Sequence, residues 1–350
     1  MRNRIIQLLI LGIAFGQTYR ALAITPNLPP LPAFSGKDLA LIVNDNDPVS
    51  VRIAKYYQQK RQIPAEQVIH VKFKTGRDSM PEDEFTAIKQ AVDQKTPVGV
   101  QAFALTWMQP YRVDCMSITT AFALGFDQAF CATGCVETQA NPYYASHSSK
   151  PYTDFKIRPT MVLAGQTFEA VKQLINRGGR SDYSRPQGSA YLLKTSDTAR
   201  SSRALFFPGI AAKYQGIWPV TYLETDVLRD KHDVMFYFTG LTHVPEINSN
   251  TFLPGAIADH LTSTGGMLTG GKQMSILEWL KAGATGSYGT VVEPCNFPAK
   301  FPNPDIVLHY YLRGNSLIEA YWKSVAQPGQ GIFIGDPLAK PFAHHELNDE

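Results

Sequence analysis

Apolar residues recur along the chain in two spacings, one typical of buried strands and the other of helices. The run LALIVND at residues 39–45 predicts a buried strand, and Asp47 followed by Pro48 predicts the start of a helix. The next residues, VRIAKYY, place apolar side chains three and four positions apart, so one face of this helix is expected to pack on a sheet. A strand that leads into an amphipathic helix is the repeating unit of α/β folds.

The same two spacings continue along the chain to residue 335. The further strands that they predict are 68–73, 98–107, 189–195, 219–225, 233–241, 287–293 and 331–335. The further helices are one with Phe85, Ile88 and Val92 on one face, one at 167–175 that Gly178 ends, and one each at 199–205, 274–283 and 315–325. The run AIADHLTST at residues 256–264 fits either a strand or a helix.

Alternating strands and helices predict a three-layer α/β/α fold around a mostly parallel sheet. We expect one unit over residues 37–345, with an N-terminal half at 37–200 and a C-terminal half at 201–345. The first strand-to-helix turn reads NDNDPVS and lacks the glycines of a dinucleotide-binding site, so no nucleotide cofactor is expected. We expect no other cofactor and no metal site.

The first 36 residues are typical of a segment that precedes the fold. Two arginines, an apolar run and the small-residue end ALA predict a secretory signal peptide at residues 1–23. Residues 24–36 contain four prolines and predict an extended leader. We therefore expect an exported protein, periplasmic or extracellular, with no membrane span in its mature form. The net charge of +3 is too small to favour nucleic-acid binding.

Periodicity fades between residues 108 and 159, in a segment rich in Cys, Asn, Tyr and Ser. We interpret 108–159 as an irregular insertion, either a functional loop or a lobe braced by disulfides. The chain has four cysteines, and an exported protein is expected to oxidise them to two disulfides. The short spacing of Cys131 and Cys135 predicts that these two pair, which leaves Cys115 to pair with Cys295; a reactive thiol at Cys295 is the alternative.

Several motifs resemble known proteins. The order of a hydrophobic strand that ends near a histidine, the segment GATGSYG, the run SLIEAYWKS and the ending GDPLAKPF resembles the gingipain-type branch of the caspase-fold cysteine peptidases. The runs NDNDPVSVRIAKYY, GATGSYGTVVEPC and GIFIGDPLAKPF are similar to a family of exported bacterial proteins related to that branch. The resemblance implies a caspase-like sheet with a catalytic histidine after one central strand and a nucleophilic cysteine after the next.

The resemblance places His243, after DVMFYFTGLT, at the position of the catalytic histidine. The next segment, AIADHLTSTGG, contains no cysteine, and Ser263 stands near the position of the nucleophile. Cys295 lies one element later, at the end of a predicted strand, and is a second candidate nucleophile. His243 as a structural histidine, Ser263 as a turn residue and Cys295 as a disulfide partner are the alternatives.

Three further residues are candidates for contact with a ligand. Glu293 lies near Cys295 and is a candidate partner for His243 or for a cationic group, while Trp107 and Arg112 follow a predicted central strand. Two hypotheses result. The chain is either an exported peptidase-like hydrolase that cleaves amide or peptide bonds with a His-assisted nucleophile, or a catalytically degenerate relative that binds a peptide, a glycan or a partner protein.

Overall fold

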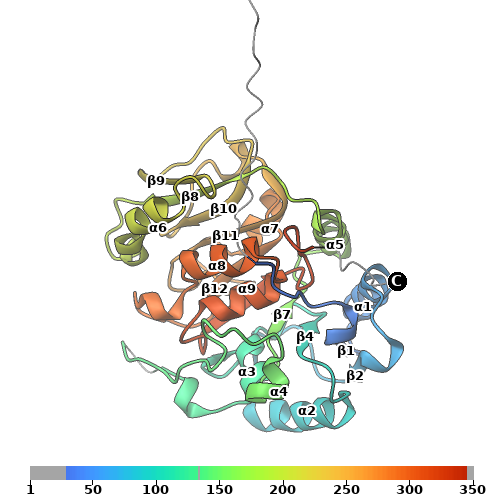
Figure 1. The fold of residues 1–350 in the computed structure, drawn as a ribbon. Coiled ribbons are helices and arrows are strands. Elements are labelled where there is room, and N and C mark those ends of the chain that lie inside the picture. Colours follow the sequence, from blue (N-terminus) through green and yellow to red (C-terminus); the bar gives the residue numbers. More distant parts are fainter. Residues whose placement is uncertain (1–28, 133–134, 345–350) are drawn as a thin grey trace, which may run out of the picture.

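The computed structural model describes residues 29–132 and 135–344, which form an α/β fold around one ten-stranded sheet (Figure 1). The predicted signal peptide and residues 24–28 of the predicted leader lie outside the described residues. In sheet order the strands are β2 (Val68–Val71), β1 (Leu39–Asn44), β4 (Ala102–Leu105), β7 (Thr160–Val162), β13 (Gly331–Gly335), β12 (Gly286–Thr290), β11 (Phe252–His260), β10 (Val234–Thr239), β8 (Ser189–Lys194) and β9 (Val220–Glu224).

The sheet consists of two parallel blocks that run in opposite directions. Strands β2, β1, β4, β7 and β13 are parallel to one another, and so are β12, β11, β10, β8 and β9. The blocks meet where β12 and β13 pair antiparallel, with Tyr288 opposite Phe333. Because the directions differ, the strands of the two blocks end at opposite edges of the sheet.

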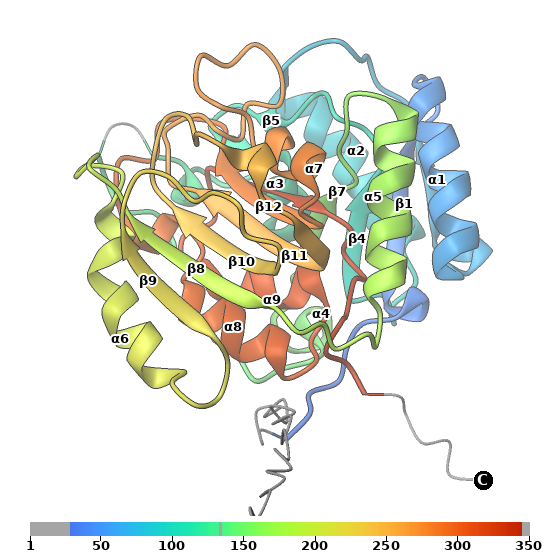
Figure 2. The ribbon, with the colours of Figure 1, turned by 90° about the horizontal axis from the view of Figure 1, so that it is seen from above.

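Helices cover both faces of the sheet, which confirms the predicted three-layer α/β/α fold (Figure 2). One face carries α1 (Pro48–Arg61), α5 (Phe168–Ser181), α6 (Phe207–Lys213), α8 (Pro304–Leu312) and α9 (Leu317–Ser324). The other carries α2 (Glu82–Lys95), α3 (Ile118–Leu124) and α7 (Leu277–Ala282). Helix α1 begins as predicted, because the Asp47 side chain accepts a hydrogen bond from the Val49 amide and Pro48 occupies the first turn.

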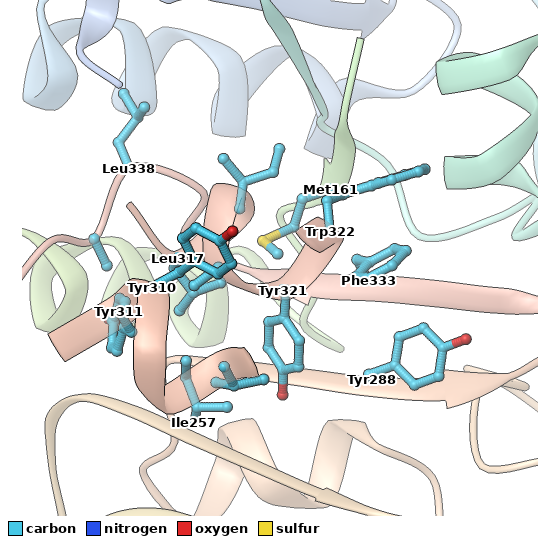
Figure 3. Close-up of a cluster of buried hydrophobic side chains, with 14 of the residues drawn as sticks. Met161, Ile257, Tyr288, Tyr310, Tyr311, Leu317, Tyr321, Trp322, Phe333 and Leu338 are labelled. Atoms are coloured by element: carbon cyan, nitrogen blue, oxygen red, sulfur yellow. The ribbon is translucent and has the colours of Figure 1, made fainter. Parts of the chain in front are cut away.

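One part of the core lies where the two blocks join, beneath α8 and α9 (Figure 3). The ring of Trp322 stacks on Phe333 of β13 with centroids 4.6 Å apart, and Tyr288 of β12 meets the same ring edge-on at 4.9 Å. Helix α9 is fixed above them by a capping box, in which the Ser316 hydroxyl and amide both donate to Glu319. Aromatic packing on both strands therefore joins the blocks into one core.

Part of the leader belongs to the fold. The Leu31 amide donates to the Arg313 carbonyl at 2.7 Å, and the Phe34 amide donates to the buried Glu319 carboxylate at 3.0 Å. Phe34 is buried in the core. The end of the predicted proline-rich leader therefore docks against the start of α9.

The predicted insertion is more regular than the sequence indicated. It contains α3, α4 (Pro151–Phe155) and two strands of a small sheet that β3 (Ser79–Met80), β5 (Arg112–Val113) and β6 (Met116–Ser117) form. Six of the seven α3 residues are buried, two threonines among them, so burial on every side leaves no amphipathic period in the sequence. Residues 135–150 contain no helix or strand, so short regular elements interrupt a segment that is otherwise irregular, as predicted.

The structure decides the element at residues 256–264 and the end of the helix that begins near residue 167. Residues 256–264 proved to belong to a strand, β11, as far as His260. Helix α5 does not end at Gly178 but continues to Ser181. A Cβ atom at Gly178 would lie 2.0 Å from a carboxylate oxygen of Asp336, so the glycine permits a close approach inside the helix and does not end it.

Candidate functional site

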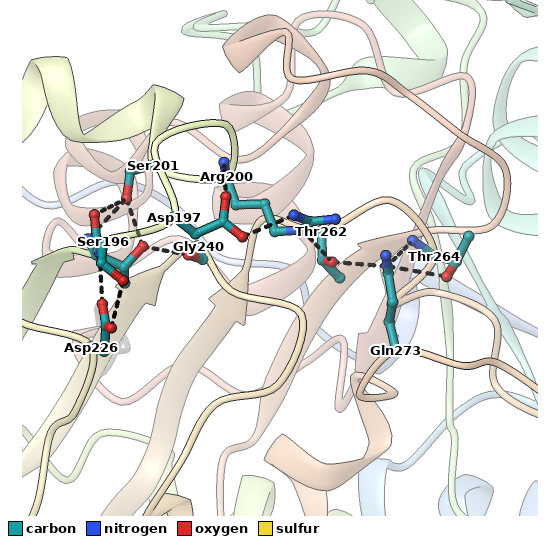
Figure 4. A network of polar contacts seen from close by, with 10 residues as sticks. Ser196, Asp197, Arg200, Ser201, Asp226, Gly240, Thr262, Thr264 and Gln273 are labelled. Carbon is teal, nitrogen blue, oxygen red and sulfur yellow. Dashed lines mark hydrogen bonds and ion pairs between the residues drawn. The ribbon is translucent and has the colours of Figure 1, made fainter.

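The loops that follow β8, β10, β11 and β12 lie at one edge of the sheet, where strand ends of a parallel block commonly hold ligands. Figure 4 shows the polar contacts among these loops. The Thr195 hydroxyl, after β8, donates to the carbonyl of Gly240, after β10, at 2.6 Å. A Cβ atom at Gly240 would lie 1.9 Å from the Arg200 carbonyl oxygen, so only glycine allows the first loop to cross the end of β10.

Arg200 is held at the centre of this edge. Its Nη1 donates to Asp197 at 2.8 Å and its Nε donates to the Thr262 hydroxyl, after β11, at 3.2 Å (Figure 4). The Arg200 side chain is 26% exposed. Its Nη2 has no acceptor among the described residues, so the guanidinium is fixed on one side and open on the other.

Gln273 completes the network. Its Oε1 accepts hydrogen bonds from the Thr262 hydroxyl at 2.8 Å, from the Thr264 amide at 2.8 Å and from the Thr264 hydroxyl at 3.1 Å (Figure 4). The turn after β11 is therefore tied to a residue nine positions beyond Thr264 and eleven beyond Thr262. The sequence prediction missed Arg200 and Gln273; the only signal was the Asp197 to Arg200 spacing of three directly after a strand.

Asp259 and His260, at the end of β11, are structural. Asp259 is fully buried and pairs with Arg203 at 2.6 Å, and burial raises the pKa of its carboxyl to about 6 although Arg203 opposes the shift. His260 accepts a hydrogen bond from the Trp279 indole at 2.9 Å and donates to the Met274 carbonyl at 3.1 Å. Burial lowers the pKa of His260 to about 3, so it is neutral and both ring nitrogens are occupied.

His243 and Ser263 follow neighbouring strands, β10 and β11. His243 is exposed, and its ring makes no hydrogen bond to the described residues. Ser263 is half-buried; its carbonyl accepts from the Thr290 hydroxyl at 2.9 Å, while its own hydroxyl has no partner among the described residues. Neither side chain is held in an orientation for catalysis by a third group.

Cys295 has no thiol, because it forms a disulfide with Cys135; Cys115 pairs with Cys131. Oxidation of the four cysteines was predicted correctly, but the predicted pairs Cys131–Cys135 and Cys115–Cys295 were wrong. The 3-10 helix Gln128–Phe130 brings Cys131 to the turn between β5 and β6, where Cys115 lies. Cys135 is bonded to Cys295, which follows β12, so the short separation of Cys131 and Cys135 did not decide the pairing.

Glu293 stabilises the turn in which it lies. One carboxylate oxygen accepts a hydrogen bond from the Cys295 amide at 2.8 Å, and the Glu293 carbonyl accepts from Gln330 at 3.1 Å. The side chain is exposed and makes no contact with His243. The structure therefore gives Glu293 a local role in the turn that carries the disulfide.

Trp107 lies away from this edge, whereas the segment that carries Arg112 returns toward it, because Gln109 donates to the Thr269 hydroxyl in the loop after β11 at 2.7 Å. Strand β4 ends at the opposite edge of the sheet, and Trp107 is 1% exposed, packed edge-on against Phe73 with centroids 4.9 Å apart. Arg112 lies in β5 and donates to the Asp114 carbonyl at 2.9 Å. Neither residue makes a hydrogen bond to His243 in the part of the chain that the structure describes, and the sequence does not reveal the reversal that places Trp107 at the other edge.

Two searches over residues 29–132 and 135–344 bear on the class of site. No group of three or more His, Cys, Asp or Glu side chains in this part of the chain has the arrangement of a metal site. None of its helices has the length and apolar character needed to cross a bilayer. The candidate site therefore consists of the Arg200, Thr262 and Gln273 network together with His243 and Ser263.

Comparison with known proteins adds no family. No protein-family model matches this chain, and no curated protein is significantly similar to it.

Proposed function

We propose that the protein is a catalytically degenerate relative of the caspase-fold peptidases that binds an extended peptide at the edge where β8, β10, β11 and β12 end. One observation carries the proposal: the polar groups of this edge are held in place by hydrogen bonds, yet no activated nucleophile stands among them. A binding site needs polar groups that are held in place, whereas a hydrolase needs an activated nucleophile in addition.

Arg200 indicates the kind of ligand. Its Nη2 is the open donor at the centre of the edge, and a guanidinium that other contacts already orient loses little conformational entropy when it pairs with a carboxylate. We therefore expect a peptide that presents a carboxylate, from an acidic side chain or its own C-terminus, to Arg200. A neutral glycan would offer Nη2 only an uncharged oxygen, which makes a weaker hydrogen bond than a carboxylate does.

The proposal is tested by peptide binding to the secreted protein. A fluorescent library of acidic peptides is screened first, and the best ligand is then measured against Arg200→Gln and against Lys194→Gln as control. Lys194 also forms an ion pair, with Glu224, but lies on β8 outside the network. We expect Arg200→Gln to weaken binding roughly tenfold and Lys194→Gln to leave it unchanged. Equal affinity in all three proteins would contradict the proposal.

A serine-type hydrolase is the second candidate. The observation that favours it is the pair of unbonded side chains, His243 and Ser263, at the ends of adjacent parallel strands. A serine-directed covalent probe should then label Ser263, and labelling should disappear both in Ser263→Ala and in His243→Ala. Such labelling would replace the binding proposal by the hydrolase hypothesis.

A further inference from the structure

A second concave site lies away from the edge described above. Residues of α2, α3 and α4 and the segment before β7 enclose a cavity of about 340 Å³. These helices lie in the lower part of Figure 1. The cavity is lined by Lys89, Asp93, Phe122, Ala123, Tyr152, Lys156 and Arg158.

The cavity gathers more positive than negative charge. Its lining contains three cationic side chains and a single carboxylate, that of Asp93. Lys89 pairs with Asp93 at 2.5 Å, and Nη1 of Arg158 lies 3.5 Å from the other oxygen of the same carboxylate. The single Asp93 carboxylate is therefore shared by two cations. With three positive side chains and one negative one, the lining has a net charge of +2.

Arg158 is built into this cavity. Its side chain is 5% exposed, its Nε donates to the Val100 carbonyl at 3.1 Å, and its guanidinium lies 3.3 Å from the centroid of the Tyr152 ring. On another side, the Phe103 ring lies 5.3 Å from it. The two rings and the carbonyl fix the plane of the guanidinium, so its terminal nitrogens are pre-organised for an oxyanion.

Lys156 adds a second cation beside the same ring. Its Nζ lies 5.4 Å from the Tyr152 centroid and donates only a long hydrogen bond, of 3.4 Å, to the Thr153 carbonyl. Two cations near one ring repel each other unless an anion lies between them. The open side of the cavity lets such an anion enter, and Phe122 and Ala123 form an apolar wall behind it.

We propose that this cavity binds a phosphate dianion, either free or as a phosphomonoester, between Lys89, Lys156 and Arg158. A dianion balances the net charge of +2, and the fixed fork of Arg158 suits two phosphate oxygens. The cavity volume leaves room for a small group attached to the phosphate. This site shares no residue with the proposed peptide site, and so the two proposals stand or fall separately.

The test is isothermal titration with inorganic phosphate, using sodium chloride of the same ionic strength as the blank. The double variant Lys89→Gln/Lys156→Gln should bind phosphate roughly tenfold more weakly than the wild type. Lys172→Gln is the control, because Lys172 pairs with Glu169 on α5 and does not line the cavity. Binding that chloride reproduces, or that the double variant retains, would overturn the proposal.

A second variant is expected to bind phosphate more tightly, and a gain in affinity cannot be explained by misfolding. Asp93→Asn removes the only carboxylate of the lining, so phosphate should bind more tightly. Unchanged or weaker binding by this variant would contradict the charge argument. Titration with glycerol phosphate distinguishes the two sources: tighter binding than inorganic phosphate indicates a phosphomonoester ligand, and weaker binding indicates free phosphate.

Discussion

Two arginine networks in this molecule use the same residue types in different surroundings. Arg200 pairs with Asp197 at the edge of the sheet, where both side chains are about one-quarter exposed. Arg61 pairs with Asp182 and Asp336 between α1, α5 and the end of β13, where Arg61 is 6% exposed and Asp336 is completely buried. Tyr57 donates to the same Asp336 carboxylate at 2.7 Å. Both networks contain an ion pair, so the pair alone does not show whether an arginine supports the fold; the two networks differ in how far their side chains are buried.

The largest change in stability is expected from a substitution of Arg61. Arg61→Leu leaves the Asp336 carboxylate buried with Tyr57 and the Leu338 amide as its remaining donors. We expect a loss of about 3–5 kcal/mol in the free energy of unfolding, because an uncompensated buried charge is costly. Urea unfolding followed by circular dichroism measures this loss. A loss under about 1 kcal/mol would show that water reaches the carboxylate.

The second largest effect is expected at the disulfides. Cys135→Ser/Cys295→Ser opens a link across 160 positions, whereas Cys115→Ser/Cys131→Ser opens one across 16. Loop-closure entropy predicts losses of about 5 and about 3 kcal/mol, with the longer loop losing more. Urea unfolding of the two double variants gives the order. The reverse order would mean that local packing outweighs chain entropy.

The third effect depends on pH and arises at His260, whose pKa is lowered to about 3 in the folded protein from 6.5. A group with a depressed pKa supports the fold above its unfolded pKa, and this support is lost as the pH falls below 6.5 toward 3. Asp259 opposes this trend, because its pKa is raised and its own contribution falls as the pH rises toward 6.

His260 alone would lower the free energy of unfolding by about 2 kcal/mol between pH 7 and pH 5, and Asp259 offsets more than half of this, so the net fall should be below about 1 kcal/mol. The measurement is urea unfolding at both pH values for the wild type and for His260→Gln. We expect the substitution to remove the fall or reverse it. An equally steep fall in both proteins would assign the pH dependence to other groups.

The smallest effect on stability is expected at Arg200. Arg200→Gln removes an ion pair of low burial, so the free energy of unfolding should change by no more than about 1 kcal/mol. The same variant should weaken peptide binding, which is the contrast with Arg61. A large loss of stability in Arg200→Gln would instead place this network with the structural one.

Local rules predicted the elements that depend on neighbouring residues. The start of α1 at Pro48, the buried strands β1 and β10, and the apolar face of α2 follow from short spacings. Helix α3 escaped prediction because both of its sides are buried, and the pairing of Cys135 with Cys295 depends on contacts between distant segments. The spacing of apolar residues identifies an element that has one buried face. It carries no information about an element that is buried on all sides or about contacts between distant segments.

The candidate site was predicted less completely than the fold. The sequence placed His243 and Ser263 after neighbouring strands, and β10 and β11 are indeed adjacent and parallel. It gave no sign that Trp107 lies at the other edge, since a strand does not encode its direction relative to strands far along the chain. Arg200 was missed because Thr262, which accepts its hydrogen bond, and Gln273, which holds Thr262, come from a different loop.

The position of β13 determines when the sheet can be completed during synthesis. Of the strands described, this one is made last, yet it lies in the middle of the sheet between β7 and β12. During synthesis, the two blocks have no strand to join them until residues 331–335 have been made. The last described strand to be made therefore completes the sheet at its centre and not at an edge.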